Sequence, residues 1–254
     1  MIKYDMHIHF DFFKSEKHIL KYYNDRKIFA IYATLSPSVF LKYKSKGVES
    51  DYVKLALGAH PCYTNEYRFD YHEFDSALEE TRYISEVGLD FSKKYIDSQN
   101  EQIKIFDYIC SKTYNKLLII HSRNAEEEIY EMLVRNRNKY MVLHWYTGPV
   151  STLKKLVLLG AYVSINRKML YTKKIDMYLS SVPIDRLLIE TDAPFTLESN
   201  NIIEFDLAYD EIVLYLCKYY NSESDLIKRK LSENFYNLIV SVKKSNSPHD
   251  NEKN

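Results

Sequence analysis

Short, continuously apolar runs alternate along the chain with stretches that carry hydrophobic residues at helical spacing. Runs such as 28–34, 117–121 and 140–144 indicate strands that are covered on both faces. Stretches such as 97–114 and 124–135 predict helices between them, the second with Asn124 as its N-cap. About eight strands alternating with helices predict an α/β fold of the (β/α)8 TIM-barrel type, and 254 residues suit one such barrel.

No internal linker or low-complexity insert interrupts this pattern, which predicts a single barrel domain over residues 1–242. Residues 243–254 are polar and poor in hydrophobic side chains, so we expect a disordered C-terminal tail. A barrel of this type builds its active site where its strands end, so the residues at those ends decide the function.

Potential metal ligands lie at the expected strand ends. On the first strand, Asp5, His7 and His9 alternate with apolar residues and therefore share one face. Because the C-terminal ends of barrel strands meet at one mouth, side chains placed there should converge. Further imidazole and carboxylate side chains stand at or near the ends of later strands: His60, Glu86, His121, His144 and Asp192.

This set favours a metal centre over a collection of unrelated core and capping residues. Two imidazoles separated by one residue can bind one ion together, and a carboxylate such as Asp5 can orient one of them. Four histidines, one glutamate and one aspartate suffice for two divalent ions when a carboxylate bridges. Imidazole and carboxylate ligands without thiolates suit zinc, manganese, nickel or magnesium.

Composition limits the partners and the compartment. Lys and Arg number 35, as do Asp and Glu, and the formal net charge of +0 argues against nucleic-acid binding through bulk charge alone. A local phosphate site at metal ions remains compatible with this balance. Cys62, Cys110 and Cys217 lack paired spacing, which fits a reducing cytoplasm. The chain has no apolar run of membrane-spanning length and no signal-peptide pattern, so we expect a cytoplasmic protein without membrane contact.

Six short blocks occur in order along the chain: 5–9 (DMHIH), 58–61 (GAHP), 86–90 (EVGLD), 121–123 (HSR), 143–148 (LHWYTG) and 188–194 (LIETDAP). These blocks resemble the TatD-type metal-dependent deoxyribonucleases of the amidohydrolase superfamily, and residues 233–237 look like the closing asparagine-rich turn of that family. The resemblance spans residues 2 to about 240. It implies a TIM-barrel hydrolase that cleaves phosphodiester bonds of DNA through a metal-activated water.

Carried over to this chain, the family pattern implies a ligand set and catalytic roles. Asp192 and Glu86 would be catalytic, and Asp192 would also take a proton from the attacking water. Supporting roles would fall to Asp5, Asp90 and Glu190, the last two outside the set of direct ligands. The ligands would be shared between two divalent ions as follows: His7, His9 and Asp192 at one ion, His121 and His144 at the other, and Glu86 at both.

Substrate contacts follow from the same resemblance. His60 and Arg123 would face a substrate phosphate, and Trp145 could stack on a base. Each has a structural alternative: His60 could brace a loop, Arg123 could pair with Glu126 or Glu127, and Trp145 could simply pack. A narrow barrel mouth favours single-stranded DNA or strand ends over an intact duplex.

Two positions depart from the family pattern. Cys62 stands where the family often has a second histidine, and residues 145–147 replace a common Cys-Phe-Ser. Neither change removes a ligand, but both affect phosphate contacts and substrate choice. Cys62 lies near the expected mouth and could touch a metal, although we expect it to be a bystander.

Part of the chain resembles a subgroup of the family, and two alternative functions remain beside the nuclease prediction. Segments 142–148, 164–170 and 191–195 are more similar to QatD, the TatD-type nuclease subgroup of the Qat system. That implies a role in bacterial anti-phage defence, with protein partners from the same operon. One alternative is a hydrolase of carbon–nitrogen bonds, although such relatives often bridge their metals with a modified lysine where this chain has Glu86. The other is a partner-binding component of a multi-protein defence complex.

Overall fold

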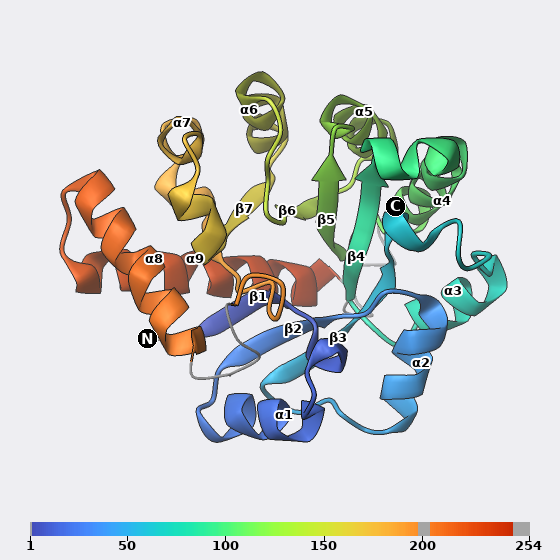
Figure 1. Ribbon diagram of the computed structural model, residues 1–254, viewed down its shortest axis with the longest axis horizontal. Coiled ribbons are helices and arrows are strands. Elements are labelled where there is room, and N and C mark those ends of the chain that lie inside the picture. The colour runs from blue at the N-terminus through green and yellow to red at the C-terminus, as the bar shows by residue number, and fades with distance from the viewer. Residues whose placement is uncertain (1, 198–203, 246–254) are drawn as a thin grey trace.

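Parallel strands form the centre of the molecule and helices surround them (Figure 1). The computed structural model describes residues 2–197 and 204–245. Within these residues, eight strands pair in chain order, each parallel to the next, as the predicted (β/α)8 barrel requires. The strands are β1 (Tyr4–Ile8), β2 (Phe29–Ala33), β3 (Val53–Ala59), β4 (Tyr83–Asp90), β5 (Leu117–Arg123), β6 (Tyr140–Leu143), β7 (Tyr162–Ile165) and β8 (Leu187–Ile189).

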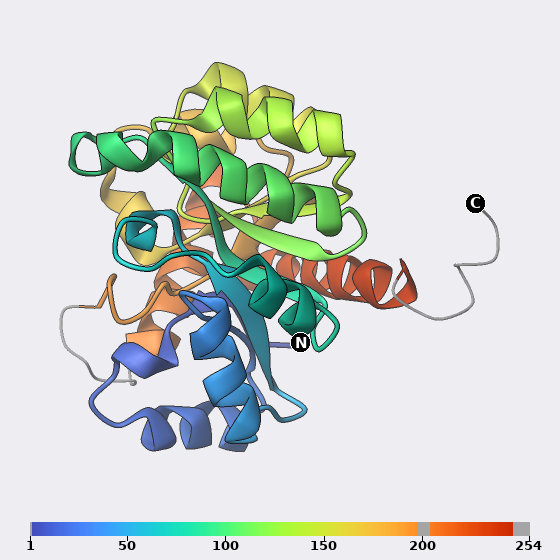
Figure 2. The same ribbon diagram turned by 90° about the vertical axis from the view of Figure 1, so that its right-hand side faces the viewer.

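Helices follow the strands and cover the outside of the barrel, with α4, α5 and α6 side by side on one flank (Figure 2). The strand residues are almost all buried because helices lie outside them and side chains fill the inside. The helices are α1 (Glu16–Asp25), α2 (Pro37–Ser45), α3 (Tyr71–Leu78), α4 (Gln99–Lys112), α5 (Glu126–Asn136), α6 (Val150–Leu158), α7 (Ile175–Leu179), α8 (Glu204–Tyr220) and α9 (Ser224–Ser245).

Hydrogen bonds beside the candidate site join the first and last strands. The part of the chain described here shows no ladder between β8 and β1, only an isolated parallel bridge between Ile8 and Ala193. The N–H of His9 donates to the carbonyl of Ala193 at 2.9 Å, and the N–H of Asp192 donates to the carbonyl of His7 at 2.8 Å. The barrel is therefore nearly closed, and its closing contacts lie on residues predicted to bind metal.

Helix α9 covers the opposite, N-terminal ends of β1 and β8. The rings of Tyr4 and Phe235 stack with their centroids 4.3 Å apart. The side-chain amide of Asn234 donates to the carbonyls of Ile184 at 2.7 Å and Leu187 at 2.9 Å. Asn234 was expected in a closing turn, but it lies inside α9 and holds that helix against β8.

Three local expectations differ from the structure. Strand β4 continues to Asp90, so Glu86 lies in the middle of a strand and not at its end. Asn124 does not cap α5: its backbone is left-handed, with φ of 55°, and its N–H donates to Glu126 Oε1 at 3.2 Å. Helix α9 reaches Ser245, and the remaining residues of the expected tail, 246–254, lie outside the described part. No helix among the described residues is both long enough and apolar enough to cross a membrane.

Candidate metal centre

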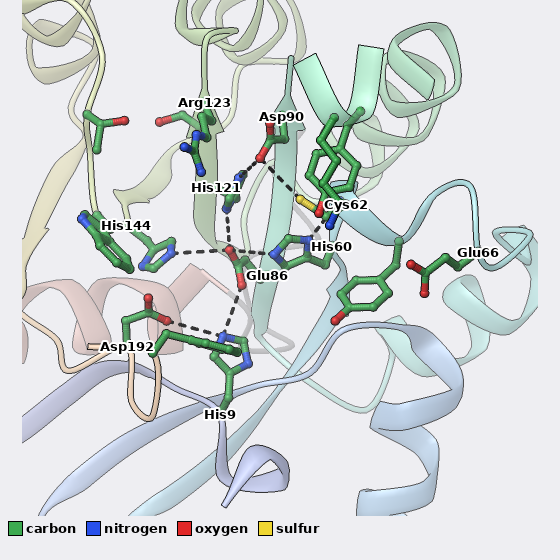
Figure 3. A pocket seen from close by; sticks show the side chains of 17 residues that line it. His9, His60, Cys62, Glu66, Glu86, Asp90, His121, Arg123, His144 and Asp192 are labelled. Atoms are coloured by element: carbon green, nitrogen blue, oxygen red, sulfur yellow. Dashed lines mark hydrogen bonds and ion pairs between the residues drawn. The ribbon is translucent and has the colours of Figure 1, made fainter. Parts of the chain in front are cut away.

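The predicted ligands converge at the C-terminal mouth of the barrel, around a cavity of about 600 Å³. Glu86 lies at the centre of this cluster, reached by side chains from several strands (Figure 3). His7 lies beneath the cavity and is fully buried. The ligands that line the cavity wall are His9, Glu86, His121, His144 and Asp192.

Four side-chain atoms form the first donor group: His7 Nε2, His9 Nε2, Glu86 Oε2 and Asp192 Oδ1. The two imidazole nitrogens lie 3.0 Å apart. Glu86 Oε2 lies 3.4 Å from His7 Nε2 and 3.3 Å from His9 Nε2. Asp192 Oδ1 lies 3.6 Å from each of the same nitrogens.

These separations fit a bound divalent ion. Ligands about 2.0–2.1 Å from a tetrahedral zinc ion lie about 3.3–3.4 Å from one another, close to the separations in this group. Two imidazole nitrogens that face each other at 3.0 Å need a shared proton or a cation between them. The donor set therefore fits the metal centre that the sequence predicts.

Two of the histidines are oriented by polar groups behind them. His7 Nδ1 lies 3.1 Å from the hydroxyl of Ser85, and His144 Nδ1 lies 3.1 Å from Glu190 Oε1. A carboxylate that accepts the Nδ1 proton leaves the Nε2 lone pair free to bind a metal. Burial alone lowers the pKa of His144, but Glu190 and Asp192 raise it well above its usual value.

Glu190 is itself held in place by Trp145, which was predicted as a substrate contact, and by Asn166 and Ser164, which were not predicted in the site. It accepts the backbone N–H of Trp145 at 3.0 Å and the side-chain amide of Asn166 at 3.0 Å, and Ser164 donates to its other oxygen. These residues come from β7 and from the segments after β6 and β7, so their common partner is not visible in the linear sequence.

The second oxygen of Glu86 faces a second donor group. Glu86 Oε1 lies 2.7 Å from His121 Nδ1, 3.3 Å from His60 Nε2 and 3.4 Å from His144 Nε2. Burial opposes ionisation of Glu86, but these three histidines hold its pKa well below the usual value. The ionised carboxylate thus contacts both groups, as a bridging ligand would.

His60 lies among the predicted ligands, but its hydrogen bonds give it another role. Its Nδ1 accepts the backbone N–H of Cys62 at 3.0 Å, so in the neutral ring the proton is on Nε2. That Nε2–H points toward Glu86 Oε1 and has no lone pair for a metal. His60 is therefore placed as a hydrogen-bond donor at the cavity wall, which fits the expected substrate contact.

His121 lies between two carboxylates. Its Nδ1 faces Glu86, and its Nε2 lies 3.1 Å from Asp90 Oδ2. Burial alone lowers the pKa of His121, but hydrogen bonds to Asp90 and Glu86 raise it to about 9. Cys62 Sγ donates to the same Asp90 oxygen at 3.4 Å. Burial is the main cause that raises the pKa of the Cys62 thiol to about 12.

Asp192 combines burial with a strained backbone. Its side chain is 6% exposed and its φ is 50°, a left-handed conformation that aspartate tolerates better than most residues. Burial raises its pKa to about 7, although His144 and His9 favour the charged form. The carboxylate can therefore change protonation state near neutral pH.

Asp5 does not orient an imidazole, contrary to expectation. Its carboxylate accepts the backbone N–H of His7 at 3.2 Å, the Tyr23 hydroxyl at 2.8 Å and the backbone N–H of Thr191 at 2.8 Å. The bond to Thr191 ties β1 to the segment after β8. Asp5 supports the centre by holding two ligand-bearing segments together, and the hydroxyl of Ser85 contacts the His7 ring.

Arg123 and Trp145 both line the cavity. Arg123 is exposed at the end of β5, and among the described residues no ion pair joins it to Glu126 or Glu127. Glu127 pairs instead with Lys155. Trp145 is half-buried, with a φ of 37° and its ring edge toward His144 at a centroid distance of 6.5 Å. Both side chains are thus available to a ligand in the cavity.

Two phenylalanines at the mouth were not assigned to the site from sequence. Phe195 is 46% exposed and Phe12 is 37% exposed, and their ring centroids lie 5.1 Å apart. Both rings pack edge-on near His9, at 5.4 Å and 5.7 Å. Phe12 lies three residues after His9, and Phe195 lies three residues after Asp192. This spacing is the sequence signal that could have placed them at the mouth.

A profile of the family described as TatD related DNase matches residues 4–239. The chain belongs to the TatD-related DNase family. The match spans all eight strands and every residue of the two donor groups. It makes the chain a metal-dependent hydrolase, and it agrees with the resemblance seen in the six sequence blocks.

Individual similar proteins are named as metal-dependent hydrolases or deoxyribonucleases. An uncharacterized metal-dependent hydrolase from Buchnera aphidicola is 29% identical over 196 residues, which are 74% of either chain. A putative deoxyribonuclease TATDN1 homolog from Enterocytozoon bieneusi is 35% identical over 115 residues, 45% of this chain and 40% of that protein. A crystal structure of YjjV, a TatD homolog from Escherichia coli, superposes with a TM-score of 0.79 at 22% identity and covers 93% of this chain and 97% of that one. A TatD-family hydrolase from Entamoeba histolytica gives 0.73 at 16% identity, over 94% and 98%. These two likenesses show that the fold is shared.

Proposed function

We propose that this TatD-family hydrolase is a nuclease that cleaves phosphodiester bonds of DNA with two divalent ions. One observation carries the proposal: the buried Glu86 carboxylate directs one oxygen at His7 and His9 and the other at His121 and His144. A carboxylate between two groups of imidazoles is the arrangement that two-ion hydrolytic centres use. The relatives named as deoxyribonucleases support DNA as the substrate.

The residues of the chain have separate tasks in such a reaction. Ions bound to the two donor groups would polarise a substrate phosphate and lower the pKa of a nearby water. Asp192, whose burial raises its pKa to about 7, would accept a proton from the attacking water. His60 would donate its Nε2–H to a phosphate oxygen, and Arg123 would add charge at the rim. Glu190 would keep the His144 ring in one orientation.

The cavity supports a substrate of limited width. A volume of about 600 Å³ is in the range that holds a small ligand, and it is too small for a duplex. A strand end or an unpaired nucleotide would fit, with Trp145 offering a ring for base stacking. We therefore propose single-stranded DNA or strand ends as the substrate.

The test uses the purified full chain after metal removal. With manganese, magnesium, zinc or nickel restored one at a time, end-labelled single-stranded DNA should be shortened, and duplex DNA should be cut more slowly. RNA, nucleosides and cyclic amides form the comparison panel. Hydrolysis of a cyclic amide or deamination of a nucleoside, without cleavage of labelled DNA, would replace the nuclease proposal with carbon–nitrogen hydrolysis.

We also propose, from sequence resemblance to QatD, that the nuclease acts in anti-phage defence with partner proteins. Three residues in the similar segments, Trp145, Ser164 and Asn166, all contact Glu190 and so help to hold His144. The gene would be expressed with its neighbours and challenged with a phage panel. The number of phage plaques should fall with the wild type and recover with Asp192→Asn. Equal numbers of plaques for both would contradict the defence role.

A further inference from the structure

Three different metal-binding side chains meet beside the Glu86 groups. Cys62 belongs to the 3₁₀ turn Pro61–Tyr63 after β3, Asp90 ends β4, and His121 lies in β5. Asp90 Oδ2 lies 3.4 Å from Cys62 Sγ and 3.1 Å from His121 Nε2, and all three donor atoms lie within 4.8 Å of one another. Cys62 and His121 are drawn on either side of Asp90 in Figure 3.

The separations suit a cation with a sulfur ligand. Zinc binds thiolate at about 2.3 Å and imidazole or carboxylate at about 2.0–2.2 Å, which places tetrahedral ligands about 3.3–3.6 Å apart. All three residues line the cavity, so an ion can reach them from solvent. Asp90 is 1% exposed and is held by the backbone N–H of Ser92 at 2.9 Å, which fixes one of its oxygens and leaves the other for the cluster.

We propose that Cys62, Asp90 and His121 Nε2 form a binding site for a thiophilic divalent cation of the zinc class, adjoining the Glu86 groups. A thiolate ligand selects zinc or cobalt over magnesium and manganese, which prefer oxygen. The sulfur ligand departs from the family pattern, because Cys62 stands where the family often has a second histidine. It requires metal binding only, and it holds whether or not DNA is the substrate.

His121 links this site to the Glu86 group. A neutral imidazole has one free lone pair, so His121 binds a cation through Nε2 or through Nδ1 but not through both. When Nε2 binds, Nδ1 keeps its proton and donates to Glu86 Oε1, 2.7 Å away. Cations that prefer sulfur would therefore occupy the Cys62 site, and cations that prefer oxygen would use His121 at the Glu86 site.

Serine provides the matched replacement for Cys62. In the absence of a cation, Cys62 donates a hydrogen bond to Asp90, and a serine hydroxyl can make that bond as well. Cys62→Ser therefore keeps the polar contact and removes the soft ligand. Cys217, which lies in α8 and is a free, partly buried thiol, supplies the control variant Cys217→Ser.

The experiment titrates the metal-free full chain with cobalt(II) without oxygen and records its absorption spectrum. Cobalt bound to a thiolate gives an intense near-ultraviolet charge-transfer band, whereas cobalt bound to nitrogen and oxygen gives only weak visible bands. We expect the intense band in the wild type and in Cys217→Ser, its loss in Cys62→Ser, and its disappearance when zinc is added in excess but not when magnesium is.

Two results would overturn the proposal. One is a wild-type spectrum with the weak visible bands of bound cobalt but no charge-transfer band. The other is a charge-transfer band that persists in Cys62→Ser. Circular dichroism checks that the variant folds, and Cys62→Ala replaces it if the serine variant does not. Because the readout is absorption, failure of the cation site is distinguishable from failure of DNA cleavage.

Discussion

At the scale of single residues, Asp192 is the position where loss of one charge should separate folding from catalysis. Asp192→Asn keeps the shape and one oxygen ligand but removes the base, so activity on single-stranded DNA should fall by about 10²–10⁴. The fold should survive because the side chain lies at the barrel mouth, outside the apolar core.

Turnover, metal content and thermal unfolding would be measured on one preparation of Asp192→Asn. Asp210→Asn, an exposed carboxylate on α8, makes the same chemical change far from the donors and should behave as wild type. Wild-type turnover in Asp192→Asn would remove Asp192 from the mechanism. Loss of folding would show that it mainly holds the loop before Pro194.

Glu86 should matter more than His60, although the two side chains touch. Glu86→Ala removes the carboxylate that contacts both donor groups, so the metal content of the purified protein should drop. His60→Ala removes a hydrogen-bond donor, so metal content should stay and activity should fall in part. Elemental analysis and cleavage assays would be run together. Full metal content and full cleavage in Glu86→Ala would contradict the bridging role.

Metal affinity should rise with pH in the metal-free protein. Burial raises the pKa of Asp192 to about 7, and hydrogen bonds to Asp90 and Glu86 outweigh burial and raise the pKa of His121 to about 9. Asp192 must lose its proton to bind the first ion and His121 must lose its proton to bind the second. Affinity should therefore gain about tenfold per pH unit up to about 7 at the first donor group and up to about 9 at the second. Competition with a chelator at several pH values measures this slope. Asp192→Asn should reduce the slope below pH 7, and a flat profile in the wild type would refute the coupling.

The sequence predicted which side chains converge at the mouth, but it was weak about what surrounds them. The shared face of His7 and His9 could be predicted because side chains alternate along a strand. The contacts of Ser85 with His7 and of Asn166 with Glu190 could not, because they join strands that are far apart in the chain. The protonated Nε2 of His60 depends on one backbone N–H, which no pattern of residue types reveals.

At the scale of elements, Gly58 lets β3 pass close to its neighbours. A Cβ at this position would lie 1.5 Å from the carbonyl oxygen of Thr34 and 3.0 Å from that of Ser85. Both atoms belong to the backbone and cannot move without shifting a strand. Gly58→Ala should therefore lower the free energy of unfolding by about 1–3 kcal/mol or more.

Chemical denaturation would measure the effect of Gly58→Ala. Gly47 is the matched control: it has a φ of 63°, and a Cβ there would meet nothing within 4 Å. Gly47→Asn keeps the left-handed conformation accessible and should change stability by less than about 1 kcal/mol. Equal effects at the two positions would show that crowding between the strands is not the cause.

The apolar strands were predictable because burial on both faces leaves an uninterrupted hydrophobic run. Strand β4 was predicted too short, since Glu86, Gly88 and Asp90 break its apolar pattern. Glu86 and Asp90 line the cavity at the mouth, where polar residues interrupt an otherwise apolar strand. The start of α5 was misjudged because Asn124 adopts a left-handed backbone and donates to Glu126. The type of each element was thus predicted correctly where hydrophobic packing determines it. Boundaries were predicted wrongly where polar residues interrupt the pattern.

At the scale of the whole molecule, bound ions should stabilise the barrel. The first donor group takes two ligands from β1 and its C-terminal end, one from β4 and one from the segment after β8. An ion there therefore joins the two ends of the sheet. An ion at a thousand times its dissociation constant adds about 4 kcal/mol. For a protein of this size each kcal/mol shifts Tm by about 2–4 °C, so chelation should lower Tm by roughly 8–16 °C.

Differential scanning fluorimetry with and without a chelator, followed by re-addition of metal, would measure this shift. His9→Ala, which lacks one donor of the joining group but keeps the second donor group, should show a smaller decrease in Tm on chelation than the wild type. A wild-type Tm that does not change on chelation would mean that the ions do not stabilise the contact between β1 and the segment after β8.

The closing bonds between β1 and the segment after β8 also bear on how the chain is made. Synthesis delivers His7 and His9 first among the proposed ligands and Asp192 last. Until Asp192 and Ala193 leave the ribosome, His7 and His9 have neither their closing backbone partners nor their second carboxylate. A nascent chain would therefore have the imidazoles of His7 and His9 but an incomplete set of ligands. The order of translation itself would keep the centre inactive until Asp192 has been synthesised.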